Sequence, residues 1–130
     1  MKEVYDFLKA CGVYYLATID GDRARVRPFG AIDLFDGKLY IQTGKVKNVS
    51  KQLHANPKIE LCAFNGKNWI RVAATAVEDR RVEAKRHMLE QYLHLQATYS
   101  AEDENMEVFY LEDATATISS FTEPARVIRF

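Results

Sequence analysis

The sequence lacks the features that mark several classes of protein. Its two cysteines, Cys11 and Cys62, belong to no CxxC motif and no Cys/His cluster, so we expect reduced thiols that pack as small apolar side chains. No apolar run approaches the ~20 residues of a membrane span, and residues 1–6 are too acidic for a signal peptide. These absences predict a cytoplasmic protein with no metal site.

The sequence also lacks an excess of charge of either sign, because 18 Lys and Arg balance 18 Asp and Glu. A zero net charge argues against binding to nucleic acid or to a membrane through a broad basic face. The charges are nevertheless sorted along the chain. Residues 21–58 carry eight basic and three acidic side chains, whereas residues 99–125 carry seven acidic ones and neither Lys nor Arg. We expect a small anionic ligand to bind at the basic stretch.

Short apolar segments separated by turn dipeptides dominate the middle of the chain. Asp20-Gly21, Asp36-Gly37 and Asn65-Gly66 lie between strand-like residues, and such pairs accept the positive φ angles of tight hairpins. Pro28 lacks an N–H, so it should lie at a bulge or a sheet edge. We predict an antiparallel meander of strands at 13–19, 24–35, 38–43, 58–64 and 68–79.

Helical spacing of apolar residues predicts three helices. The first ends at Gly12, which suits a helix C-terminus, and the second runs from near Val46 to the Asn56-Pro57 pair. The third covers 80–96, with its apolar face formed by Val82, Leu89, Tyr92 and Leu93.

Two later strands, near 106–111 and 114–121, and a short one in the tail 125–130 complete the expected elements. A length of 130 residues with 48% hydrophobic residues suits one domain over 1–130. The sum is an α+β domain, with an antiparallel barrel or sheet and about three helices.

The most informative segment is the strand-to-helix transition at 39–49. A strand ends at Thr43, a glycine turns the chain, and Lys47 and Asn48 fall in the first turn of the helix. Helix N-termini carry unpaired N–H groups and the positive end of the helix dipole, so this segment suits a phosphate. By itself it is equally compatible with a solvated helix start. Neither a GxxxxGK[ST] nor a GxGxxG motif is present, which excludes P-loop and Rossmann sites on motif grounds.

A second informative segment carries alternating arginines. Arg23, Arg25 and Arg27 should point to one face of a strand. Pro28 and Gly30 open the backbone beside that face, so a ligand could bond to main-chain groups while an arginine reaches its phosphate. A plain solvated strand face would show the same alternation.

These segments resemble the FMN-binding split β-barrels of the pyridoxamine 5′-phosphate oxidase-like superfamily. The resemblance is carried by Arg-Val-Arg-Pro-Phe-Gly at 25–30, Tyr-Ile-Gln-Thr-Gly at 40–44, Lys-Asn-Val at 47–49 and Trp-Ile-Arg-Val at 69–72. Within the superfamily, the small nitroimidazole-resistance-type flavoproteins are most similar. The resemblance implies an α+β fold, an antiparallel split β-barrel with about three flanking helices, and a homodimer with FMN at the subunit interface.

The resemblance also implies which residues bind the cofactor. They are Val26 and Pro28 through main-chain atoms at the isoalloxazine ring, Arg27 at the phosphate or flavin, Gln42 and Thr43 at the ring and phosphate, Lys47 and Asn48 at the phosphate, and Trp69 and Arg71 from the second subunit. The Arg-x-His segment of the vitamin B6 oxidase is absent, so oxidation of pyridoxamine phosphate itself is not expected.

In such proteins the hydride chemistry belongs to flavin N5, so we predict no catalytic side chain. The implied function is an FMN-dependent oxidoreductase acting on a small molecule. A non-catalytic flavin- or haem-binding split barrel and a purely structural interaction domain remain alternatives. His54, His87 and His94 are isolated in the sequence and are most simply solvated, although such histidines could ligate a haem.

Overall fold

The computed structural model describes residues 1–130. Three α-helices, one 3₁₀ helix and eight strands follow one another: α1 (Lys2–Cys11), β1 (Tyr14–Asp20), β2 (Arg23–Phe29), β3 (Asp33–Phe35), β4 (Lys38–Gly44), α2 (Asn48–Ala55), β5 (Lys58–Phe64), β6 (Asn68–Asp79), α3 (Val82–Gln91), the 3₁₀ helix η1 (Leu93–Ala97), β7 (Met106–Ser120) and β8 (Arg126–Arg129). None of the helices combines the length and the apolar character that crossing a membrane requires.

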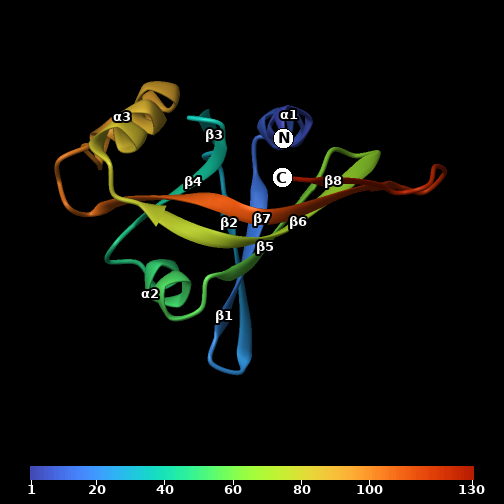
Figure 1. Ribbon diagram of the computed structural model, residues 1–130, viewed down its shortest axis with the longest axis horizontal. Helices are drawn as coiled ribbons and strands as arrows, with labels where there is room; N and C mark the ends of the chain where they lie inside the picture. The colour runs from blue at the N-terminus through green and yellow to red at the C-terminus, as the bar shows by residue number, and fades with distance from the viewer.

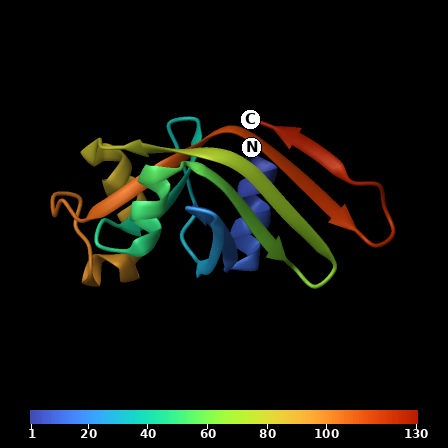
Figure 2. The same cartoon turned by 90° about the horizontal axis from the view of Figure 1, so that it is seen from below.

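All eight strands belong to one antiparallel sheet, in the order β2-β1-β5-β6-β7-β4-β3 with β8 beside β7. Because β2 and β3 end the sheet without pairing with each other, the barrel is open. The long strands β6 and β7 arch over the molecule, and the three α-helices lie beneath that arch (Figure 2). The two termini lie close together (Figure 1), where Arg126 pairs with Glu3. The predicted α+β split barrel with about three helices is confirmed.

The three turn dipeptides form the hairpins β1–β2, β3–β4 and β5–β6, as predicted. In the second hairpin Asp36 and Gly37 adopt φ angles of 53° and 71°, which few residue pairs tolerate. A simple meander is wrong, however. β5 returns beside β1 and β4 pairs with β7, so tertiary contacts rather than chain order arrange the hairpins.

The predicted strand at 24–35 is two strands, β2 and β3, separated at residues 30–32. Pro28 lies on β2, an edge strand, as its missing N–H requires. The break is fixed by Tyr14, whose fully buried hydroxyl donates to the Ala31 carbonyl at 2.6 Å. That bond turns the chain away from β2 and toward β3.

The predicted helix at 80–96 is also divided, because α3 ends at Gln91 and η1 follows. Tyr92 leaves the helical conformation, with φ −134°. Its hydroxyl accepts a hydrogen bond from the Ile32 N–H and donates one to the Ile32 carbonyl. Leu93, expected in the core, is consequently 70% exposed.

The structure also corrects three smaller predictions. The strands near 106–111 and 114–121 are one strand, β7, in which Asp113 adopts a φ of 50°. α2 begins at Asn48, two residues later than expected, so Lys47 caps the helix and does not lie within it. Cys62 is exposed rather than packed in the core.

The core has two parts on the inner side of the sheet. Val4 and Leu8 of α1 pack with Leu16, Leu61 and other buried strand residues in the larger part. The smaller part lies under α3, where Met88 packs with Tyr40, Met106 and Val108.

A carboxylate bonded to Tyr40 of the smaller core, that of Asp79, makes the free energy of unfolding depend on pH in the acid range. Asp79 is buried, and it accepts hydrogen bonds from the Tyr40 hydroxyl at 2.7 Å and from the Arg81 guanidinium at 2.9 Å. The bonds from Arg81 lower the pKa of Asp79 to about 2. A pKa below its unfolded value stabilises the fold above that unfolded value, near 4, and the stabilisation is lost as the pH falls toward 2.

We expect this carboxylate to contribute about 1–2 kcal/mol at neutral pH, discounted because Arg81 is half exposed. Denaturant unfolding of the wild type and of Asp79→Asn between pH 5 and pH 2 measures it. The difference in unfolding free energy between the two proteins should shrink as the pH falls. A difference that stays constant over this range would contradict the assignment.

Candidate functional site

Two adjoining cavities lie beside the start of α2, and Lys47 lines both. The first has a volume of about 820 Å³ and separates the β1–β2 hairpin from α2. The second, of about 400 Å³, lies where the break between β2 and β3 faces the end of β4 and the segment around η1. Together they form a site with two chemically different ends.

The first cavity is basic. Arg25, Arg27, Lys47 and Lys51 contribute to its lining, and Asp20 is its acidic residue. Arg25 pairs with Asp20 at 3.0 Å, so Arg27 and the two lysines carry the uncompensated charge. Asn48, the first residue of α2, also lines this cavity beside the positive end of the helix dipole. The arrangement suits a phosphate.

Arg27 lines the first cavity but is already bonded within the chain. Its guanidinium donates to the Leu16 carbonyl at 3.2 Å, to Thr18 Oγ1 at 2.7 Å and to Gln52 Oε1 at 2.6 Å. Burial, together with the charge of Arg25, lowers the pKa of Arg27. Because these bonds connect β1 and β2 to α2, Arg27 positions the start of the helix. A guanidinium has five N–H donors, so Arg27 can still donate to a ligand.

The second cavity combines backbone, amide and hydroxyl groups. Pro28 and Gly30 line it from the break after β2, and Gln42 and Thr43 line it from β4. Gln42 Nε2 donates to the Thr43 carbonyl at 3.0 Å. Thr43 Oγ1 is buried and has no hydrogen-bond partner. A buried polar atom without a partner is costly, and Thr43 is one of the residues that line this cavity.

The structure distributes most of the predicted cofactor ligands over the two cavities. Val26 lines the first cavity with Arg27, Lys47 and Asn48, whereas Pro28, Gln42 and Thr43 line the second.

The two remaining predicted ligands, Trp69 and Arg71, lie on β6 and line neither cavity. Arg71 lies opposite Cys62 of β5, and Cys62 lies opposite Tyr15 of β1. Tyr15 in turn lies opposite Pro28 of β2. Residues directly opposite one another point to the same face, so these side chains share the outer face of the sheet.

Tyr92 and His94 also line the second cavity, although the sequence did not place them among the flavin-binding residues. They reach it because α3 ends early and η1 folds back toward the break after β2. Sequence spacing carried no signal for this, since the predicted helix continued through both residues.

Comparison with known proteins identifies the family. The sequence matches the family model described as pyridoxamine 5'-phosphate oxidase over residues 1–118. No curated protein matches it. A NimC/NimA family protein of Clostridium acetobutylicum has a similar solved structure, with 41% identity, a TM-score of 0.96 and coverage of 100% of this chain and 92% of that one.

More distant structures share the fold alone. A putative pyridoxamine 5'-phosphate oxidase of Listeria innocua is 19% identical, with a TM-score of 0.67 and coverage of 98% and 96% of the two chains. HutZ of Vibrio cholerae, described as a haem storage protein, is 14% identical, with a TM-score of 0.67 and coverage of 85% and 87%. The family model spans most of the chain, and the chain belongs to the pyridoxamine 5′-phosphate oxidase family.

Proposed function

We propose that this chain is an FMN-binding flavoprotein and acts as an oxidoreductase on a small molecule. The observation that carries the proposal is the pair of adjoining cavities, one basic and one with the unpartnered hydroxyl of Thr43. FMN has a matching shape, with a dianionic phosphate at one end and a ring with polar edges at the other. When bound, FMN supplies hydride transfer through its N5 atom.

The phosphate end of the cofactor belongs in the first cavity. Lys47 and Asn48 would bind the phosphate at the start of α2, where unpaired N–H groups and the helix dipole add to the lysine charge. Arg27 would act mainly by holding α2 against β1, through Gln52 and Thr18. Lys51, on the next turn, adds a longer-range positive charge.

The ring end belongs in the second cavity. Thr43 Oγ1 and the Gln42 side chain would face the polar edge of the ring, and main-chain atoms near Val26 and Pro28 would lie along it. These residues bind and orient the ring. The residues of the site act by orientation and electrostatics, and none is assigned a proton-transfer role.

The proposed assembly is a homodimer with FMN at the interface, formed through the outer face of the sheet. That face exposes Tyr15 (51%), Phe64 (57%) and Val127 (49%), and an uncovered apolar face of this kind marks an interaction surface. Trp69 and Arg71 lie on the same face as Tyr15 and Pro28. A second copy on this face would bring its own Trp69 and Arg71 toward the flavin of the first.

Haem is the second candidate ligand of the same site. The observation that favours it is His94, which lines the second cavity and would offer an imidazole nitrogen to the haem iron. HutZ, which has the same fold, is described as a haem storage protein. A Soret band in the purified protein would select haem, whereas a flavin spectrum would select FMN.

A comparison of FMN with riboflavin tests the proposal most directly, because the two differ only in the phosphate. Cofactor-free protein should bind FMN about 100-fold more tightly than riboflavin, given roughly 1.5–3 kcal/mol for each charged hydrogen bond to the phosphate. Quenching of flavin fluorescence measures both affinities. Equal affinities would show that the basic cavity takes no phosphate, and a protein that takes up neither flavin would contradict the function.

Reduction of the bound FMN by a nicotinamide donor separates an oxidoreductase from a flavin carrier. We place this activity in the cytoplasm and assign it to residues 1–130 as one cofactor-binding domain.

A further inference from the structure

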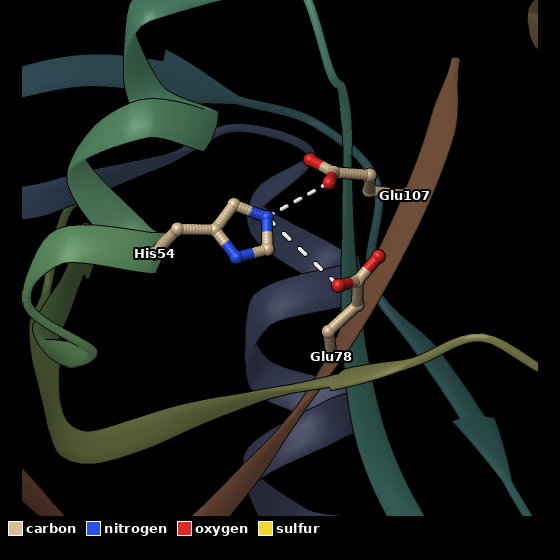
Figure 3. A group of neighbouring side chains, drawn as sticks. All are labelled: His54, Glu78 and Glu107. Carbon is tan, nitrogen blue, oxygen red and sulfur yellow. Dashed lines mark hydrogen bonds and ion pairs between the residues drawn. The ribbon is translucent and has the colours of Figure 1, made fainter. Parts of the chain in front are cut away.

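A separate group of side chains, of types that can bind a metal, includes none of the residues that line the two cavities. His54 of α2, Glu78 of β6 and Glu107 of β7 point toward one another (Figure 3). His54 Nε2 is 2.9 Å from Glu107 Oε2 and 3.9 Å from Glu78 Oε1. We propose that these three side chains bind one divalent metal ion of the zinc class.

The spacing of the three ligand atoms suits a metal ion. One nitrogen and two carboxylate oxygens all lie within 4.8 Å of one another. A zinc ion about 2.0–2.2 Å from each ligand holds neighbouring ligand atoms roughly 3–3.5 Å apart. Small rotations of the Glu78 side chain, which is partly exposed, would bring its oxygen to that distance.

Glu107 is held in the orientation that a metal ligand needs. Its side chain is only 5% exposed, and Ser50 Oγ donates to its Oε1, which leaves Oε2 directed at His54. Hydrogen bonds that fix a ligating carboxylate from behind are typical of metal sites. Ser50 and His54 lie one turn apart on α2, so the same helix supplies both the ligand and its support.

The charges of the group also favour a divalent cation. A neutral imidazole and two carboxylates carry two negative charges, one of them on a buried side chain, and a divalent ion compensates both. The three side chains line a third cavity, whose other charged residues are Lys45, Arg80, Lys85 and Glu104. Arg80 approaches Glu78 at 3.4 Å but is 85% exposed, so it is a weak competitor for that carboxylate.

The ligand types narrow the choice of ion. Imidazole and carboxylate together suit zinc and neighbouring transition metals, and zinc binds more tightly than manganese at such sites. The three side chains leave a fourth position open for water. A bound metal would cross-link α2 to β6 and β7. None of its three ligands lines the cavity that contains Lys47 and Lys51, so metal binding can be tested without the flavin.

The test uses protein freed of metal with a chelator and then titrated with zinc chloride. We expect saturation at one zinc per chain, measured by calorimetry and by elemental analysis after dialysis. His54→Gln and Glu78→Gln should each weaken binding by at least about 10-fold. These two variants leave the buried Glu107 in place, so both should fold.

His94→Gln is the matched control, since it removes an exposed histidine elsewhere, and it should bind zinc as the wild type does. Zinc should also raise the Tm of the wild type and of His94→Gln, but not that of His54→Gln. The proposal is overturned if wild-type protein shows no saturable binding below about 100 μM zinc. It is also overturned if His54→Gln binds zinc as tightly as the wild type.

Discussion

Replacing Lys47 by glutamate is expected to weaken FMN binding by about 100-fold or more. Lys47 lines both cavities at the cap position of α2, so its charge lies beside the proposed phosphate position. The substitution removes a cation and adds an anion that repels the phosphate. Fluorescence titration with FMN measures the loss.

Riboflavin distinguishes lost charge from a damaged site. Its affinity should change far less in Lys47→Glu, because it carries no phosphate. Lys67→Glu is the matched control, since Lys67 is an exposed lysine in the β5–β6 turn and lines neither of the two cavities. An unchanged FMN affinity in Lys47→Glu would place the phosphate elsewhere.

Replacing Tyr15 by aspartate is expected to dissociate the proposed dimer. Tyr15 is 51% exposed and lies on the outer face of the sheet, in register with Cys62 and Pro28. Buried aromatic residues at the centre of an interface contribute about 2 kcal/mol or more, so the dimer dissociation constant should rise by at least ~30-fold. Light scattering at micromolar protein concentration measures the mass.

Leu93→Asp provides the control, because Leu93 is 70% exposed and lies on η1, not on a strand of that face. It should remain a dimer. Tyr15→Asp should also lose FMN affinity, since the partner's Trp69 and Arg71 would no longer reach the site. A wild type that is monomeric at these concentrations, or a Tyr15→Asp protein that remains dimeric, would refute the assembly.

The sequence predicted the local elements well, since their causes lie within a few residues. Each hairpin depends on a dipeptide that accepts positive φ, and α1 ends where Gly12 adopts a φ of 78°. β5 and β6 have the predicted bounds. The failed boundaries at residues 30–32 and at Tyr92 both coincide with tyrosine hydroxyls, of the buried Tyr14 and the partly buried Tyr92, that bond to distant backbone.

The candidate cofactor site could be predicted in part for the same reason. Thr43, Lys47 and Asn48 are neighbours in the sequence, so a strand end and a helix start bring them together by local geometry alone. The state of Arg27 could not be predicted, because its acceptors come from β1 and α2. Trp69 and Arg71 line neither cavity, and in the proposed dimer they come to the cavities from the second copy.

By itself, the sequence determined the turns and most strands. It also determined that basic and acidic residues are separated along the chain, although the net charge is zero. Only the tertiary structure decided that β5 pairs with β1 and that β7 lies between β6 and β4. Those pairings, with α2 packed beside them, bring His54, Glu78 and Glu107 within 4.8 Å. No motif spans three such distant residues, because their proximity follows from strand order and helix docking, which depend on burial of the whole core.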